Sequence, residues 1–331
     1  MRTILNYLFE HKALTKEEAR EVLINIANGK YNECEIAAFL TVYIMRSITV
    51  EELSGFREAL LELCLRVDLS DYNTIDMCGT GGDNKDTFNI STLASFIVAG
   101  AGIRVAKHGN YGVSSACGSS NVIEYFGYKF TNDESKLRRD LEEAGICFLH
   151  APLFHPAMKT VAPVRRQLSV KTFFNMLGPM VNPGFPQYQV TGVFSLDLAR
   201  LYNYLLQQTD KKYYILHSLD GYDEISLTGS FKAISNNSET IVTTDELGLG
   251  KYKQSQLYGG STVEEAAKIF MDVLEGEGTE SQNAVVIANA AMGIKCVHQE
   301  RSLNDCVEAA RESLIRKKAL QALNKLIKKS S

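Results

Sequence analysis

The 331-residue sequence lacks long apolar segments. No apolar run reaches the ~20 residues that a membrane-spanning helix needs. The N-terminus, MRTILNYLFEHKALTKEE, has no apolar core of the kind found in secretory signals. We therefore expect no membrane association and a cytoplasmic location.

Cysteine pairs and an excess of basic residues are also missing. The seven cysteines are scattered and no CxxC occurs, so neither a zinc site of that type nor a disulfide framework is indicated. Free thiols in a reducing compartment are expected instead. With 35 Lys and Arg against 39 Asp and Glu, the formal net charge is −4. General nucleic-acid binding needs a basic surface and is not expected, although a local basic pocket for a small anion remains compatible with this charge.

The first 66 residues read as helices only. Three capping boxes mark helix starts, and each precedes apolar residues at helical spacing. The capping pairs are Thr15 with Glu18, Asn32 with Glu35 and Thr49 with Glu52. We predict a helical domain over residues 1–70, joined by a helical segment near residues 161–180.

The pattern changes near residue 74, where short apolar stretches begin to alternate with helical ones. TIDMC (74–78) predicts a strand, residues 94–102 a buried helix and residues 103–110 a second strand. Helical patterns close the chain at residues 262–274 and 303–328. The expected fold class is α/β: a small all-helical domain and a larger α/β domain, residues 71–331, with a central, mainly parallel sheet flanked by helices.

The stretch GTGGD, residues 79–83, stands between the first predicted strand and the first buried helix. Glycines let backbone N–H groups approach a ligand, and a helix N-terminus attracts anions, most often phosphate. The pattern is neither GxGxxG nor GK[ST], so the usual dinucleotide and P-loop sites are not indicated. A tight strand-to-helix turn is the alternative. Ser91 and Thr92 likewise read either as helix N-caps or as ligands of a phosphate or metal ion.

A second polar loop follows the second strand, and it contains Lys107-His108-Gly109-Asn110 and several serines. Lysine suits a phosphate as a point charge, and ligands gather at the carboxyl ends of strands in open α/β sheets. Farther along, Asp223-Glu224 is either solvated charge or, beside a phosphate site, a ligand pair for Mg²⁺. Arg165 could grip a carboxylate in a bidentate manner, whereas His155 reads equally well as a buried, hydrogen-bonded histidine.

Together these segments resemble the anthranilate phosphoribosyltransferases over nearly the whole chain. The glycine and KHGN loops are shared with a wider group that includes pyrimidine nucleoside phosphorylases. HPAMKTVAPVR and FNMLGPMVNP are more particular to the anthranilate enzymes. The resemblance implies transfer of the 5-phosphoribosyl group from 5-phosphoribosyl 1-diphosphate (PRPP) to the amine of anthranilate, in tryptophan biosynthesis. It also implies Mg²⁺ as cofactor and a homodimer joined through the helical domains.

The resemblance further implies a set of site residues. Those expected to bind PRPP are Gly79, Gly82, Asp83, Thr87, Asn89, Ile90, Ser91, Thr92, Lys107, His108, Gly109, Asn110, Tyr111, Gly112, Val113, Ser114, Ser115 and Ser119. Those expected to bind anthranilate are Gly79, Asn110, His155 and Arg165. Ser91, Asp223 and Glu224 would hold the metal. No general acid or base is implied, and the transition state would be supported by Lys107, Asn110 and Arg165.

The sequence departs from the family at position 111, where Tyr111 replaces a common arginine, so the expected donor site has one cation fewer. Two rival functions remain open at this stage. A pyrimidine nucleoside phosphorylase would share the glycine loops but not Asp223-Glu224. A nucleic-acid-binding member of the family would fit poorly with the net charge of −4.

Overall fold

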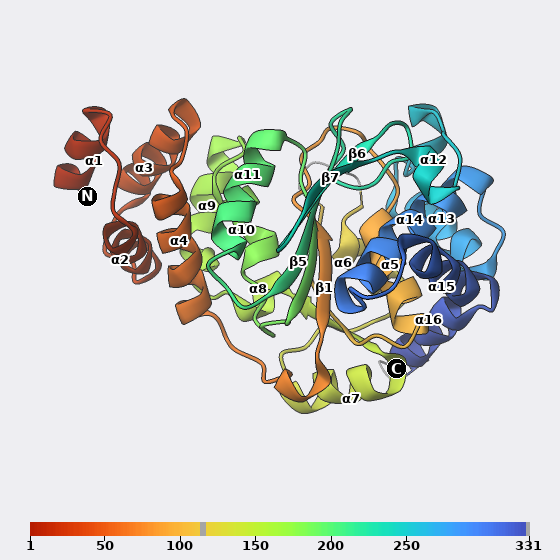
Figure 1. Ribbon diagram of the computed structural model, residues 1–331. Coiled ribbons are helices and arrows are strands. Elements are labelled where there is room, and N and C mark those ends of the chain that lie inside the picture. Colours follow the sequence, from red (N-terminus) through yellow and green to blue (C-terminus); the bar gives the residue numbers. More distant parts are fainter. Residues whose placement is uncertain (113–116, 329–331) are drawn as a thin grey trace. The chain divides into compact units, whose positions relative to one another are not determined.

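The computed structural model describes residues 1–112 and 117–328. The chain forms two compact units, and Figure 1 labels many of their helices and strands. The helical unit comprises Met1–Val67 and Ala151–Pro183, and the α/β unit comprises Asp68–His150 and Gly184–Ser331. No helix in the described ranges is long and apolar enough to cross a membrane.

The helical unit begins with four helices, and the starts of the second, third and fourth follow the capping pattern. All three capping boxes are confirmed, because each capping side chain accepts from the backbone N–H of the residue three positions on and that glutamate side chain accepts in return. The elements of this unit are α1 (Arg2–Phe9), α2 (Lys16–Ala27), α3 (Glu33–Met45), α4 (Val50–Leu63), α8 (Ala151–Phe154), α9 (Met158–Leu168), α10 (Phe174–Leu177) and the 3-10 helix η2 (Gly178–Met180).

An aromatic cluster ties residues 151–183 to the first four helices. The ring of Phe173, just before α10, stacks on Phe56 of α4 at a centroid distance of 4.4 Å. It also meets Tyr43 of α3 edge-on at 5.3 Å. Such offset-stacked and edge-on contacts contribute beyond the area they bury. A segment from much later in the sequence thus completes the core of the helical unit.

The carboxylate of Glu52 is the polar centre of the helical unit, and this residue is fully buried. Its oxygens accept hydrogen bonds from Leu14 N at 3.0 Å, Tyr43 Oη at 3.1 Å and Arg46 Nη1 at 2.9 Å. Burial would raise the pKa of Glu52, but the bonds from Arg46 and the backbone outweigh it and hold the pKa below its usual range. The charge therefore stays in place and links three segments of the unit.

The α/β unit is built on one seven-stranded sheet with the order β3-β2-β1-β4-β5-β6-β7. The first five strands in this order run parallel, β6 pairs antiparallel with β5, and β7 pairs antiparallel with β6. The strands are β1 (Ile75–Gly79), β2 (Val105–Gly109), β3 (Ile146–His150), β4 (Tyr188–Gly192), β5 (Lys212–Ser218), β6 (Phe231–Ser235) and β7 (Glu239–Val242). The expected fold class is confirmed: an all-helical part accompanies an α/β part with a mainly parallel sheet.

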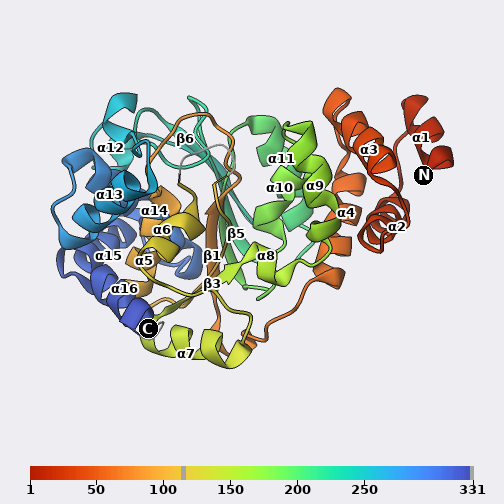
Figure 2. The same ribbon diagram turned by 180° about the vertical axis from the view of Figure 1, so that it is seen from behind.

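Helices cover both faces of this sheet (Figures 1 and 2). The helices and 3-10 helices of the unit are η1 (Ser70–Tyr72), α5 (Ile90–Gly100), α6 (Ser119–Tyr125), α7 (Glu134–Ala144), α11 (Leu196–Leu206), α12 (Thr244–Leu247), η3 (Gln254–Leu257), α13 (Val263–Glu275), α14 (Glu280–Val297), α15 (Leu303–Ile315) and α16 (Lys318–Lys328). Helix α11 packs against β5 and β6, whereas α5 and α14 pack on the opposite face.

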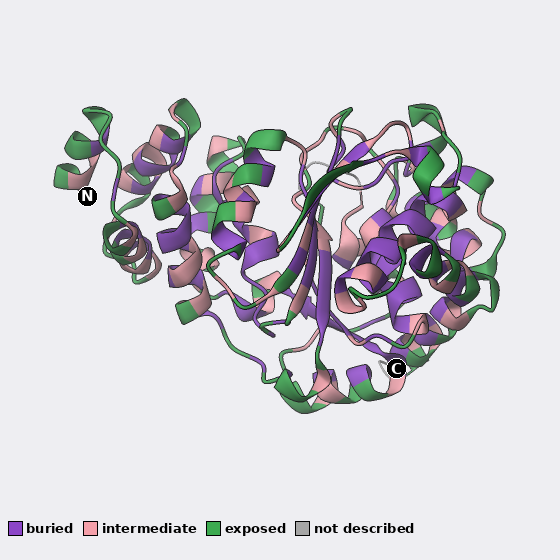
Figure 3. Ribbon diagram, in the orientation of Figure 1, coloured by how far each residue is buried: buried purple, intermediate pink, exposed green. Residues whose placement is uncertain are grey.

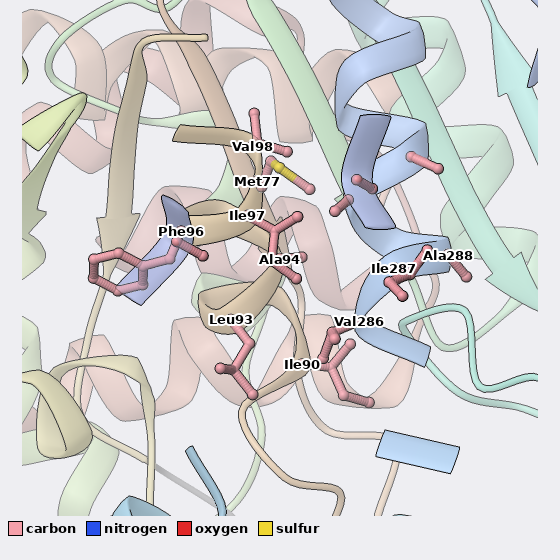
Figure 4. Close-up of a cluster of buried hydrophobic side chains, with 14 of the residues drawn as sticks. Met77, Ile90, Leu93, Ala94, Phe96, Ile97, Val98, Val286, Ile287 and Ala288 are labelled. Atoms are coloured by element: carbon pink, nitrogen blue, oxygen red, sulfur yellow. The ribbon is translucent and has the colours of Figure 1, made fainter. Parts of the chain in front are cut away.

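The main hydrophobic core lies between the sheet and the pair α5 and α14. Figure 4 shows side chains of β1, α5 and α14 gathered there, among them Met77, Ile97 and Val286. Strand β1 is buried over most of its length, while the edge strand β7 is mostly exposed (Figure 3). Parallel strands need cover on both faces, which the helices supply.

Two expectations about helices are corrected, and one helix was missed. Helix α5 starts at Ile90 with Asn89 as N-cap, so Ser91 and Thr92 lie in its first turn and are not N-caps. The pattern over residues 303–328 is two helices, because Lys317 adopts a positive φ of 56° between α15 and α16. Helix α14 was not expected from the sequence, because it is buried on nearly all sides and so shows no amphipathic pattern.

We expect Glu52→Ala to lower the free energy of unfolding of the helical unit by about 3–5 kcal/mol, because Arg46 would lose its buried partner. The matched control is Glu58→Ala in the same helix, which breaks the exposed 2.6 Å pair with Lys16 and should cost about 0–1 kcal/mol. Urea denaturation followed by circular dichroism measures both, and equal losses would contradict the assignment.

The pKa of Glu52 adds a dependence on pH. Since it is lower in the folded protein, the stability that Glu52 contributes should be complete above the unfolded-state pKa of about 4.3. It should disappear as the pH falls through the lower pKa of the folded state. The difference in stability between wild type and Glu52→Gln should shrink over that acidic range.

Candidate functional site

The predicted loops meet at the carboxyl ends of the central strands, here called the sheet edge, because β1, β2, β4 and β5 are parallel and adjacent. Gly79 ends β1 and opens the glycine loop (residues 79–83), and Gly109 ends β2. The acidic loop (residues 223–225) follows β5. The strand order reverses direction between β1 and β4, which is where open α/β sheets bind their ligands.

The acidic loop is bound to the glycine loop and to α5. Asp223 Oδ2 accepts from the N–H of Gly81 at 2.6 Å, and Glu224 Oε1 accepts from the N–H of Ser91 at 2.9 Å. Both bonds join positions more than 130 residues apart. The carboxylates expected to hold a metal are thus placed beside the glycine loop and the hydroxyl-bearing first turn of α5.

Two strand-end glycines make this close approach possible. A Cβ on Gly192, at the end of β4, would overlap the carbonyl oxygen of Asp223. A Cβ on Gly79 would overlap the Asp223 carboxylate. These residues are paired across β1 and β4. Glycine is therefore required here for space, and the acidic loop rests directly on the sheet edge.

The glycine loop and the residues after it adopt an unusual backbone. Gly81 and Gly82 have φ values of 67° and 82°, and Asn84 and Asp86 follow with 57° and 50°. Left-handed conformations of non-glycine residues are uncommon and occur most often at Asn and Asp. A cluster of such residues is typical of a ligand-binding loop whose strain is stabilised by the surrounding fold.

The site concentrates buried charge of both signs. Burial, together with the charges of Glu224 and Asp83, raises the pKa of Asp223 well above its usual range. Burial and the charge of Asp83 also raise the pKa of Glu224. Lys107 is almost fully buried, and its Nζ donates to Met77 O at 2.5 Å. Burial lowers the pKa of Lys107, and the neighbouring acidic groups oppose that shift.

This arrangement fits a hard divalent cation. Crowded carboxylates with raised pKa values are stabilised by a cation, and the donor set of two carboxylates and a hydroxyl consists of oxygen atoms only. In the described parts of the chain, no three His, Cys, Asp or Glu side chains are arranged as a metal cage. A cation held by Ser91, Asp223 and Glu224 would take its other ligands from water or a phosphate-bearing substrate, as Mg²⁺ commonly does.

Comparison with known proteins gives consistent matches. A family model described as "Glycosyl transferase family, a/b domain" matches residues 71–320, and one described as "Glycosyl transferase family, helical bundle domain" matches residues 2–64. The chain is 62% identical over 330 residues to the anthranilate phosphoribosyltransferase of Flavobacterium johnsoniae, with 98% of each chain covered. This chain belongs to the anthranilate phosphoribosyltransferase family.

Solved structures agree with that membership. The anthranilate phosphoribosyltransferase of Thermus thermophilus superposes with a TM-score of 0.91 at 31% identity, covering 98% of each chain. The enzyme of Saccharomyces cerevisiae, solved in complex with PRPP and Mg, has a TM-score of 0.89 at 24% identity, covering 96% of this chain and 93% of that one, and supports the fold. The chain is therefore a pentosyltransferase, and neither rival function is needed to explain its motifs.

The second loop of this transferase is shaped by α6. Asn121 Oδ1 accepts from the N–H groups of both Gly112 and Gly118 at 2.9 Å each. Ser119 Oγ donates to Asn110 O at 3.3 Å. Among the PRPP residues expected in this loop, Val113, Ser114 and Ser115 lie outside the described residues. His108 is buried, and its N–H donates to Asp76 Oδ1 at 3.1 Å.

Tyr111, the departure from the family pattern, contacts α6 and β3. Its hydroxyl donates to Glu124 at 3.1 Å, and its ring meets His150 edge-on at a centroid distance of 4.8 Å. These contacts fix the side chain against its own unit.

A cavity of about 210 Å³ lies beside Thr87 and Asn89 and was only partly expected. Its other wall is formed by residues 258–261, which no sequence pattern placed there. Thr87 pairs with Tyr258 in an antiparallel bridge, and Asn89 Nδ2 donates to Cys117 O at 3.0 Å. Ile90 and Thr92, also expected at the donor, are buried at the start of α5.

Of the four residues expected to bind anthranilate, His155 and Arg165 belong to the helical unit, whereas Gly79 and Asn110 belong to the α/β unit. Arg165 Nη2 donates to Asn175 Oδ1 at 3.2 Å, and its guanidinium lies over the Phe174 ring at 5.4 Å. Burial lowers the pKa of Arg165. His155 is buried in the same unit. Their expected role toward anthranilate stays a prediction.

We expect Gly192→Ala to destabilise the α/β unit by about 1–3 kcal/mol, because the added methyl group must displace the backbone of the acidic loop. Gly229→Ala is the matched control: it lies in the same region, and its added methyl would make only ordinary contacts, the nearest at 3.7 Å. Denaturant unfolding of both variants measures the difference, and a fully stable Gly192→Ala would refute the close packing.

Proposed function

We propose that the donor site of this enzyme is the sheet edge formed by the glycine loop, the first turn of α5 and the acidic loop, with Mg²⁺ as cofactor. The reaction transfers the 5-phosphoribosyl group of PRPP to the amine of anthranilate and releases diphosphate, a step of tryptophan biosynthesis. The carrying observation is the pair of bonds from Gly81 and Ser91 to Asp223 and Glu224. These bonds join the glycine loop, the first turn of α5 and the acidic loop, which are all expected to bind PRPP or its metal ion.

The reaction determines which charges the site must stabilise. The amine nitrogen displaces diphosphate at the anomeric carbon, so positive charge develops on the sugar and negative charge on the leaving group. Bound Mg²⁺ would neutralise the departing diphosphate. Lys107, whose Nζ donates to the Met77 carbonyl of β1, would add a positive charge. The oriented N–H groups of the glycine loop would add partial charges. Because an arylamine loses its proton readily after attack, no general base is assigned.

For the acceptor we propose Arg165 as the group that binds the anthranilate carboxylate, with Gly79, Asn110 and His155 as further contacts. A guanidinium held by Asn175 and Phe174 is oriented in advance and loses little conformational freedom on binding. Holding both substrates in reacting geometry removes much of the entropic barrier.

We expect the fluorescence of anthranilate to decay when the enzyme, PRPP and Mg²⁺ are all present, and to stop decaying when EDTA removes the metal. Omitting each component in turn provides the controls. A flat trace from folded protein would overturn the proposal and direct attention to a nucleobase acceptor. Phosphorolysis of thymidine and uridine is the assay for that alternative.

We further propose a cytoplasmic homodimer joined through the helical unit. Three exposed apolar side chains of α1 and α3 support a dimer interface on this unit: Phe9 is 60% exposed, Ile44 46% and Met45 84%. Apolar side chains that are grouped and exposed commonly mark an interaction surface. Fractionation of the source cells tests the location.

We expect Met45→Glu to shift the protein from dimer to monomer in analytical ultracentrifugation, because a charge would be buried in the interface. Ile315→Glu in the α/β unit, at a side chain 68% exposed, is the control and should leave the dimer intact. A wild-type protein that sediments as a monomer at every concentration would exclude this assembly.

A further inference from the structure

Asn289 is a polar side chain in α14, a helix that is buried on nearly all sides. Its neighbours Ile287, Ala288, Ala290 and Ala291 are all buried, and Asn289 is itself only 5% exposed. Burying an amide without hydrogen bonds carries a large desolvation cost. A buried amide at such a position therefore needs partners.

The partners of Asn289 belong to the acidic loop. Its Oδ1 accepts from Ile225 N at 3.0 Å, and its Nδ2 donates to Ile225 O at 2.8 Å. The second Nδ2 proton is used by Val285 O, one turn earlier in α14, at 2.8 Å. One amide thus binds both backbone groups of the residue that follows Glu224, as a neighbouring β-strand would. Two bonds to one residue fix its orientation as well as its position.

A second side chain holds the loop from the sheet. Ser218, the last residue of β5, donates from Oγ to the carbonyl of Glu224 at 2.7 Å and accepts from Ser226 N at 3.3 Å. The backbone on the carboxyl side of Glu224 is therefore bonded to both α14 and β5. Asn289 also lines the same small cavity as Ser91, Asp223 and Glu224.

We propose that Asn289 is a positioning residue for the cation site. By fixing the peptide of Ile225, it directs the Asp223 and Glu224 carboxylates toward Gly81, Ser91 and the Mg²⁺ that accompanies the PRPP diphosphate. This rests on the proposed donor site. The hydrogen bonds of the Asn289 amide go to backbone groups, so its effect on the site would pass through the acidic loop, as is usual for groups that orient metal ligands.

The chemistry of the amide matters as much as its size. Leucine has a similar volume but would leave the N–H and C=O of Ile225 and the C=O of Val285 without these bonds. Aspartate would keep an acceptor but would face two carbonyl oxygens and add a negative charge beside Glu224. Both substitutions should loosen the loop or turn its carboxylates.

The test compares Asn289→Leu with Asn283→Leu. Asn283 lies in the same helix but donates to Gly278 O at 3.0 Å, away from the acidic loop. Isothermal titration calorimetry measures PRPP binding at a series of Mg²⁺ concentrations, and Mn²⁺ electron paramagnetic resonance measures cation binding directly. We expect Asn289→Leu to weaken Mg²⁺-dependent PRPP binding by about 10–100-fold. At saturating Mg²⁺, the kcat of Asn289→Leu should return close to the wild-type value. The Mg²⁺ concentration needed for half-maximal rate should stay higher than in wild type.

The control separates positioning from simple destabilisation. Asn283→Leu should lower the melting temperature without changing the apparent Mg²⁺ affinity. Equal Mg²⁺ affinities in wild type and Asn289→Leu would overturn the inference while leaving the donor site intact. If wild type itself binds PRPP without any Mg²⁺ dependence, the proposed cation site fails and the inference fails with it.

A milder variant keeps the test decisive should Asn289→Leu fail to fold. Ser218→Ala removes the bond to the carbonyl of Glu224 without touching α14. It should shift the apparent Mg²⁺ affinity in the same direction, by a smaller factor. An unchanged affinity in folded Ser218→Ala would contradict the proposal that the backbone of this loop controls the site.

Discussion

The rest of the site depends on one constraint: two adjacent acidic residues lie directly against the carboxyl ends of the central strands. Asp223 and Glu224 are desolvated, and the nearby charge of Asp83 adds to their cost of ionisation. Their positions are possible only because Gly79 and Gly192 leave room at the ends of β1 and β4. The parallel order of the central strands brings these ends together.

The second loop and the acidic loop are held by side chains of helices, one of which follows its loop directly and one of which is distant in the sequence. Asn121 of α6 bonds both Gly112 and Gly118, and Asn289 of α14 bonds both backbone groups of Ile225. In both places one amide fixes two backbone groups. An amide can do this without adding charge to a site whose electrostatics are already crowded. The acidic loop and the described ends of the second loop are therefore fixed by side chains of α14 and α6.

Local patterns predicted local structure well. The capping boxes of α2, α3 and α4 and their apolar faces follow from residues three or four positions apart, and the structure confirms them. The loops after β1 and β2 were also found, because glycine and polar residues after a strand have a short-range signature. The start of α5 was misplaced, since Ser91 and Thr92 resemble N-caps but Asn89 takes that position.

What the sequence could not provide depends on long-range pairing. Helix α14 has no polar face, so neither the helix nor the role of Asn289 could be recognised from spacing. Residues 258–261 reach the site through a bridge to Thr87, more than 170 residues earlier. Even the Asp223-Glu224 pair could be interpreted as a metal site only in combination with the other motifs. Such contacts arise from the fold, and no local pattern encodes them.

Lys107 indicates how the site achieves its electrostatic balance. A lysine that is 1% exposed loses most of its hydration, yet the acidic groups around it oppose the resulting fall in its pKa. Its bond to the Met77 carbonyl of β1 uses one of the three donors of the ammonium group and fixes the position of Nζ. In the proposed donor site, a leaving diphosphate would therefore meet a group that is already positioned, so little reorganisation energy would be spent during the reaction itself.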